Sequence, residues 1–185
     1  MNENYVKIID NFLPDMLFEE LNLFVRQIKW TNSPQYLSEL CDNIDVGIPK
    51  VPEIYNNQFV YYILNDKGFS NISNDFILHF VEYLEDKLNS IKLLRMKFNL
   101  SVPLESQYTF GWHKDMEQFS HLPGYKTAVL YLNDNDGYTV LEDGTKIESV
   151  SNRLAVFNGN IYHAPVNATN VRNRLVLNIN YIEGN

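Results

Sequence analysis

The segment GWHKDMEQ, residues 111–118, places a histidine and an aspartate one residue apart. Side chains at alternate positions of an extended segment point to the same face, so His113 and Asp115 would converge while Lys114 points away. An imidazole and a carboxylate that face the same way are two ligands of a transition-metal site. The pair alone fits a polar loop equally well, because this spacing is common by chance.

A third ligand decides between the two interpretations. His163 lies in the segment IYHAP, on an expected strand, and antiparallel strands can bring distant residues side by side. Two histidines and one carboxylate form the facial triad that suits non-haem Fe(II) and leaves positions open for other ligands. We expect neither of the other two candidates to ligate, because His79 lies off the apolar stripe of an expected helix and His121 lies in a loop.

An anion-binding residue is predicted eleven residues after the second histidine, where Arg174 lies in the segment RNRLVLNINY. A guanidinium binds a carboxylate through two parallel hydrogen bonds and keeps its charge. If Arg174 faces the interior, Val176, Asn178 and Asn180 share its face, and such a polar face is natural for a pocket. The alternative is a surface strand with a solvated arginine, and Arg172 is the rival anchor.

The elements that must position these residues are helices first and strands later. Pro14 opens an expected helix whose apolar stripe runs to about Trp30, and Ser73 is the expected N-cap of a second helix whose stripe runs to Ile91. Residues 31–57 are expected to be irregular, because three prolines interrupt them.

Alternating apolar and polar residues predict strands after residue 91, with turn signals such as Asp143-Gly144 between them. The expected strands, with a short one near the N-terminus, are Tyr5–Ile9, Met96–Ser101, Thr127–Leu132, Tyr138–Glu142, Thr145–Val150, Arg153–Phe157, Ile161–Val166 and Arg174–Ile182. Helices followed by antiparallel strands indicate an α+β, mainly β fold, in which a sandwich or barrel is backed by helices.

Length and composition limit the function classes. The 185 residues suit a single domain, 1–185, and no segment is apolar enough to span a membrane. The net charge of −8 makes nucleic acid an unlikely partner and favours a peptide or small-molecule substrate. The only cysteine, Cys41, cannot form an internal disulfide and the N-terminus is no signal peptide, so we expect a cytoplasmic protein.

The order of the two histidines, the aspartate and the arginine resembles the 2-oxoglutarate- and Fe(II)-dependent dioxygenases. Three segments extend the resemblance to prolyl 4-hydroxylase-like enzymes: KTAVLYLND, DGYTVLEDG and NRLAVFNGNIYHAPV. In the second of these, Asp136 stands where the family's Gly-Gly-x-Thr pattern has its first glycine. The match covers roughly residues 92–182, whereas residues 1–91 carry no recognised motif and are expected to be helical support and substrate-side loops.

The resemblance implies a double-stranded β-helix, or jelly roll, with Fe(II) held by the triad near one mouth. It implies that 2-oxoglutarate chelates the iron and pairs its far carboxylate with Arg174 and Tyr131, while Thr139 lines the pocket. Reaction with O2 would give succinate and CO2 and hydroxylate the substrate, and ascorbate is a candidate requirement. Because the sequence is similar to small stand-alone enzymes of bacteriophages and bacteria, the expected compartment for a phage-encoded protein is the host cytoplasm.

Other residues are candidate contacts for substrate or co-substrate. They are Asn99, Trp112, Asn178 and Asn180. Large aromatic residues near strands pack in cores more often than they line pockets, so packing is the alternative for Trp112 and its neighbour Phe110. A substrate lid formed by Tyr55, Tyr61 and Tyr62 is a weaker interpretation than packing of these rings.

Two other functions fit the same residues. One is a binding module on this fold that has lost catalysis, against which the intact triad and Arg174 argue. The other is a zinc-dependent hydrolase or lyase with an activated water, for which Glu117 is the only nearby general base. A structural zinc site would require a fourth protein ligand, and Cys41 lies far upstream.

Overall fold

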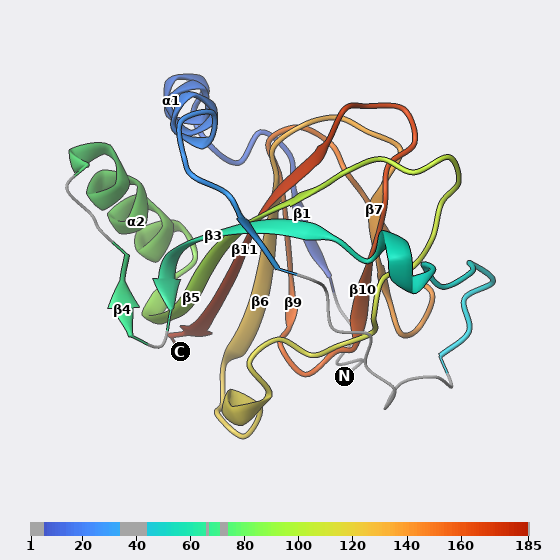
Figure 1. Ribbon diagram of the computed structural model, residues 1–185. Helices are drawn as coiled ribbons and strands as arrows, with labels where there is room; N and C mark the ends of the chain where they lie inside the picture. The colour runs from blue at the N-terminus through green and yellow to red at the C-terminus, as the bar shows by residue number, and fades with distance from the viewer. Residues whose placement is uncertain (1–5, 34–43, 66, 71–73, 185) are drawn as a thin grey trace.

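The computed structural model describes residues 6–33, 44–65, 67–70 and 74–184, which form two β-sheets and two α-helices (Figure 1). The elements in chain order are β1 (Lys7–Ile9), α1 (Asp15–Val25), β2 (Thr31–Asn32), η2 (Glu53–Tyr55), β3 (Gln58–Asn65), β4 (Gly68–Phe69), α2 (Asp75–Lys87), β5 (Ser90–Ser101), η3 (Glu117–Phe119), β6 (Tyr125–Tyr131), β7 (Tyr138–Leu141), β8 (Lys146–Glu148), β9 (Arg153–Asn158), β10 (His163–Val166) and β11 (Arg174–Glu183).

The two sheets form a jelly-roll core. The large sheet has the strand order β1-β9-β6-β11-β5-β3-β2, with β4 paired to β3, and the small sheet has the order β10-β7-β8. The paired strands are antiparallel, and many neighbours, such as β1 with β9 and β5 with β11, come from distant parts of the chain. The mainly β jelly roll backed by helices, predicted from the sequence, is therefore confirmed.

The helices pack on the face of the large sheet that points away from the small sheet (Figure 1). Leu21 of α1 and Phe80 and Leu84 of α2 are fully buried in a cluster with apolar residues of β5, β6 and β11. Burial of this apolar face supplies the main stabilisation of the sheet.

Strand β11 separates the apolar core from the polar interior. Leu177, Ile179 and Tyr181 point to the helices, as members of the core cluster. Arg174 and Asn178 are also buried but line a cavity on the opposite face. This is the division between alternate residues that the sequence predicted.

The helices are shorter than predicted. Helix α1 ends at Val25 instead of near Trp30, and Ile28 and Trp30 pack against the same core from the segment that follows. Apolar residues therefore continue at helical spacing past the end of α1, because their side chains can be buried without a helical backbone.

Helix α2 is capped by Asn74, whose side chain accepts the Phe76 N–H at 3.0 Å. The predicted cap, Ser73, lies outside the described residues. Ile91, expected on the stripe of this helix, lies instead on β5 and is 72% exposed.

The strands after residue 126 match the predicted ones, with ends shifted by two residues or fewer. Of the earlier strands, the predicted Tyr5–Ile9 is found as β1, whereas β3 was missed and β5 begins at Ser90 instead of Met96. Residues 1–91 therefore supply strands of the large sheet as well as helices.

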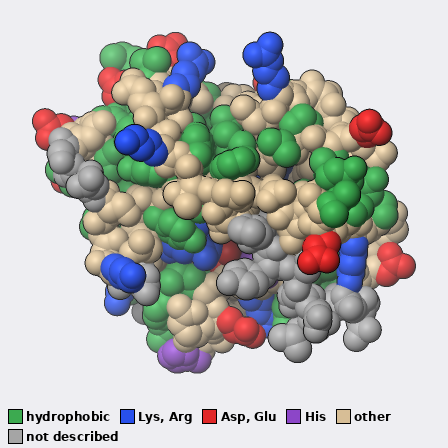
Figure 2. Space-filling view, in the orientation of Figure 1, with side chains coloured by type: hydrophobic (Ala, Val, Ile, Leu, Met, Phe, Trp, Pro, Cys, Tyr) green, Lys and Arg blue, Asp and Glu red, His purple; other side chains and the backbone are tan. Residues whose placement is uncertain are grey.

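The surface of the face shown in Figure 2 mixes basic, acidic and apolar side chains. Within the described part of the chain, no helix is both long and apolar enough to span a membrane.

Candidate metal centre

The small sheet positions the two histidines opposite each other. The His113 N–H donates to the His163 carbonyl at 3.1 Å, and the His163 N–H donates to the His113 carbonyl at 3.0 Å. This doubly bonded antiparallel pair puts the ring centroids 4.6 Å apart. The segment that carries His113 thus extends the small sheet beyond β10, although it forms only isolated bridges.

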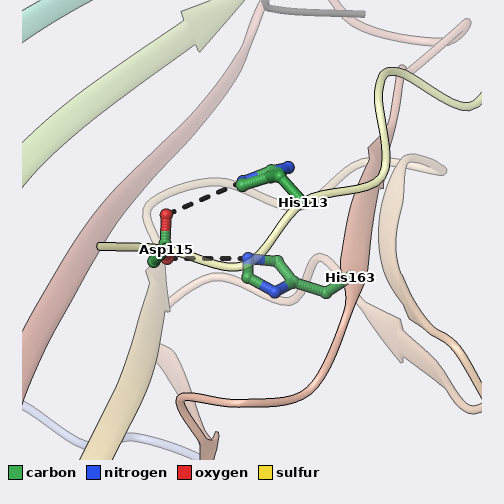
Figure 3. Close-up of side chains that lie close together, drawn as sticks. All are labelled: His113, Asp115 and His163. Atoms are coloured by element: carbon green, nitrogen blue, oxygen red, sulfur yellow. Dashed lines mark ion pairs between the residues drawn. The ribbon is translucent and has the colours of Figure 1, made fainter. Parts of the chain in front are cut away.

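Asp115 completes a cluster of three candidate ligands (Figure 3). Its two carboxylate oxygens face different histidines: Oδ1 lies 3.7 Å from Nε2 of His113, and Oδ2 lies 3.6 Å from Nε2 of His163. Ligand atoms of all three residues lie within 4.8 Å of one another. The His-Asp-His triad predicted from the sequence is therefore present.

Backbone carbonyls select the tautomer of each histidine. Nδ1 of His113 lies 2.9 Å from the Gly111 carbonyl, and Nδ1 of His163 lies 3.1 Å from the Ile161 carbonyl. A carbonyl only accepts, so each Nδ1 carries the proton and each Nε2 keeps its lone pair free on the side of Asp115. Desolvation at the cavity wall and the neighbouring His163 lower the pKa of His113 to about 4, which favours the neutral, ligating form.

Hydrogen-bond donors from the large sheet surround the Asp115 carboxylate. The Nδ2 groups of Asn178 and Asn180 donate to Oδ2 at 2.8 and 3.2 Å, and Arg95 forms an ion pair with Oδ1. Burial alone would raise the pKa of Asp115, but the Arg95 guanidinium holds it well below its usual range. The carboxylate therefore stays ionised, as a metal ligand must be.

Arg95 was not anticipated from the sequence. It lies on β5 opposite Asn180 of β11, and it also donates to Asn178 Oδ1 at 3.1 Å. The available signal was its position two residues before Lys97, on the same polar face of an alternating strand.

A buried arginine lies in the same cavity as the triad. Arg174 is 4% exposed, its Nε donates to Ser149 Oγ at 3.1 Å, and its Nη2 donates to Thr139 Oγ1 at 3.3 Å. No carboxylate among the described residues forms an ion pair with it. The rival Arg172 is exposed. A buried, uncompensated guanidinium is costly, so an anion bound beside Arg174 would be stabilising.

The comparisons identify the fold. No family model and no curated protein matches the chain. Among solved structures, a prolyl-4-hydroxylase of Pseudomonas putida is 18% identical, with a TM-score of 0.60, and the alignment covers 98% of this chain and 94% of that one. A 2OG-Fe(II) oxygenase family oxidoreductase of Burkholderia pseudomallei is 13% identical, with a TM-score of 0.67 and coverage of 97% and 86%. This chain has the fold of the 2OG-Fe(II) oxygenases.

A further oxygenase-fold neighbour was solved with ligands. HygX of Streptomyces hygroscopicus, with nickel, 2-oxoglutarate and hygromycin B bound, is 13% identical, with a TM-score of 0.54 and coverage of 98% and 84%. The resemblance drawn from the sequence motifs is confirmed at the level of the fold and the triad.

The oxygenase fold encloses a cavity of about 350 Å³ between the two sheets. Its lining includes the triad, Arg174 and Thr139, and Asn99 and Tyr62 lie on the wall formed by β5 and β3. Tyr131 does not line the cavity: it is fully buried behind Thr139, and its hydroxyl donates to Thr139 Oγ1 at 2.8 Å.

Two expected substrate contacts lie elsewhere. Trp112 is 3% exposed and packs with Tyr138 and Val166 in an apolar cluster of the small sheet, whereas its neighbour Phe110 lines the cavity. Burial of the large indole ring is favourable there, so the packing alternative describes Trp112. Asn180 is also fully buried, and it holds Asp115 instead of lining the cavity.

The remaining candidate residues differ in how far their side chains are exposed. Glu117, His79 and His121 are exposed and are not part of the triad. Tyr61 packs against the core cluster and Tyr55 is 47% exposed, so of the three candidate lid tyrosines only Tyr62 lines the cavity.

Proposed function

We propose that the protein is an Fe(II)- and 2-oxoglutarate-dependent oxygenase that hydroxylates a peptide or small-molecule substrate and releases succinate and CO2. One observation carries this proposal: a His-Asp-His cluster and a buried arginine without an anionic partner share one cavity. A metal and a carboxylate ligand would satisfy both at once.

The donor set fits Fe(II). His113 and His163 offer neutral Nε2 atoms, and Asp115 offers an ionised carboxylate. Two nitrogens and one oxygen on one side of an ion leave positions open for a co-substrate and O2. Bound iron would supply the O2 and electron-transfer chemistry of the site.

The anion site fits the far carboxylate of 2-oxoglutarate. Arg174 would pair with it, and the Thr139 hydroxyl beside the guanidinium would line the pocket. Tyr131 would support this site from behind Thr139, because its hydroxyl donates to Thr139 and its ring centroid lies 5.5 Å from the guanidinium carbon of Arg174. Ser149 fixes the guanidinium plane by accepting from Nε.

The chain's own residues prepare the site for this chemistry. Asn178, Asn180 and Arg95 keep the Asp115 carboxylate ionised and fixed in orientation. The Gly111 and Ile161 carbonyls keep each imidazole proton on Nδ1, away from the metal.

The test begins with binding. Without O2, the wild-type protein should bind Mn(II) and then 2-oxoglutarate, as measured by calorimetry. With Fe(II), ascorbate and O2, it should form succinate from 2-oxoglutarate, slowly when no substrate is present. The His113→Ala variant should lose both metal binding and succinate formation, while His79→Ala, at an exposed histidine of α2, should keep them. Failure of wild-type protein to bind Mn(II) or Fe(II) would refute the proposal.

A further inference from the structure

A row of polar side chains on β5 faces the cavity beside the triad. Arg95, Lys97 and Asn99 all line the cavity, whereas Met96 and Phe98 between them belong to the core under the helices. Arg95 is paired with Asp115. The other two residues have no role in the metal or 2-oxoglutarate sites proposed above.

Lys97 lacks an anionic partner. Among the described residues, no carboxylate lies within ion-pair distance of its ammonium group, whose nitrogen lies 6.0 Å from the centroid of the Tyr62 ring. Burial, with the nearby Arg95, lowers the pKa of Lys97 to about 8, which records the cost of holding this charge in the wall. An anion beside the ammonium group would remove that cost.

Lys97 and Arg174 lie at different levels of the large sheet. Lys97 is opposite Asn178 on β11, and Arg174 is opposite Ser101 on β5. Four residues separate these levels, about 13 Å along the strand. A carboxylate held by Arg174 therefore leaves Lys97 for a second ligand.

The charge of the cavity favours a second ligand that carries a negatively charged group. Of the described residues, four basic side chains line it, those of Arg95, Lys97, Lys114 and Arg174, against one acidic side chain, that of Asp115. Adding a dication and the dianionic 2-oxoglutarate leaves the excess of positive charge unchanged. This basic lining contrasts with the chain's net charge of −8, so the overall composition does not explain it.

Asn99 places a second requirement on the ligand. Its Oδ1 is buried without a hydrogen-bond partner, two residues along the same face from Lys97. A buried carbonyl oxygen of this kind calls for an N–H or O–H donor. A ligand that satisfies both residues carries a negative group and a donor close to each other.

We infer that the substrate is a small carboxylate with a neighbouring hydrogen-bond donor, such as a free amino acid, held by Lys97 through its carboxylate and by Asn99 through its donor. A cavity of about 350 Å³ that also holds 2-oxoglutarate suits a ligand of this size. An internal peptide residue other than Asp or Glu has no free carboxylate and would leave Lys97 unpaired. This inference rests on the proposed function.

The experiment compares free acids with their amides. The protein is loaded with Mn(II) and 2-oxoglutarate without O2, and the standard L-amino acids, their C-terminal amides and their N-acetyl amides are titrated by calorimetry. At least one free acid should bind, and its amide should bind roughly tenfold or more weakly, as expected for loss of a charge-assisted hydrogen bond. The same acid should stimulate succinate formation with Fe(II) and gain one oxygen atom by mass spectrometry.

Variants on one strand assign the effect to Lys97. Lys97→Gln should weaken binding of that acid by a similar factor and leave the affinities for Mn(II) and 2-oxoglutarate within about twofold. Lys92→Gln, at an exposed lysine of the same strand, should leave all three affinities unchanged.

Three results would overturn the inference while leaving the proposed function intact. They are equal binding of acids and amides, no binding of any acid to protein that does bind Mn(II) and 2-oxoglutarate, and a loss of 2-oxoglutarate affinity in Lys97→Gln. The last result would assign Lys97 to the co-substrate. Failure of wild-type protein to bind metal would instead refute the proposed function.

Discussion

Replacement of Arg174 by methionine tests the anion site most directly. The guanidinium is buried and donates to Ser149 and Thr139, but no described carboxylate pairs with it, so the incoming carboxylate would be its sole anionic partner. Truncating one side of a buried, hydrogen-bonded charge pair costs about 2–5 kcal/mol. At about 1.4 kcal/mol per factor of ten, 2-oxoglutarate should bind at least roughly 30-fold more weakly.

Calorimetric titration of Mn(II)-loaded protein without O2 measures this change, and thermal unfolding provides an independent check. At a 2-oxoglutarate concentration of about 100 times the wild-type Kd, the ligand should stabilise wild-type protein by about 2.7 kcal/mol. A 30-fold weaker variant should gain less than about 1 kcal/mol at the same concentration. Unchanged Mn(II) affinity in Arg174→Met would show that the triad itself is intact.

Arg172→Met is the matched control, because Arg172 is exposed and lies two residues earlier on the chain. Exposed charges contribute about 0–1 kcal/mol, so its 2-oxoglutarate affinity should change by less than roughly fivefold. Arg174 would not be the anion site if Arg172→Met lost affinity for 2-oxoglutarate and Arg174→Met did not. The same conclusion would follow if Arg174→Met bound 2-oxoglutarate as tightly as wild-type protein does.

Three further predictions concern the cavity wall, the support of the triad and the core. Burial lowers the pKa of Lys97 to about 8, and only the charged form attracts an anion. Affinity for a carboxylate substrate should therefore fall as pH rises through that value. In calorimetric titrations between pH 7 and about 9.5, Lys97→Arg should show no such fall, because arginine keeps its charge. Asn180→Ala removes a donor to Asp115 and should weaken Mn(II) binding by about tenfold or more, with an unchanged far-UV circular dichroism spectrum; unchanged metal affinity would contradict the supporting role given to Asn180. Leu84→Ala should lower the free energy of unfolding in urea by about 2–5 kcal/mol, because the side chain is fully buried. Leu78→Ala on the same helix, where the side chain is 47% exposed, should lower it by less than about 1 kcal/mol. Equal losses would mean that α2 does not pack as described.

The chemistry of the site could be predicted because the residues that carry it follow simple spacing rules. His113 and Asp115 share a face through their spacing of two, and Arg174 shares a face with Asn178 through alternation along one strand. Both relations are properties of extended backbone and need no knowledge of distant contacts.

The supporting contacts depend on register, which a single sequence does not reveal. Arg95 reaches Asp115 only because β5 pairs with β11 so that Arg95 lies opposite Asn180. Trp112 could not be placed because an aromatic ring beside a ligand gains as much from core packing as from lining a pocket. Strand β3 was missed although its residues QFVYYILN favour strands, because the prolines before it suggested an irregular segment.

The hydrogen bonds around Asp115 have a consequence for how the protein would acquire the proposed metal. Asp115 already has amide and guanidinium partners, and both histidine tautomers are fixed by backbone carbonyls. The ligands are thus arranged by the protein alone, so folding can precede loading and a chelator should remove the ion without unfolding the chain. Reversible exchange of this kind would let the metal supply of the cell, together with the choice of ligand atoms, decide which ion the site carries.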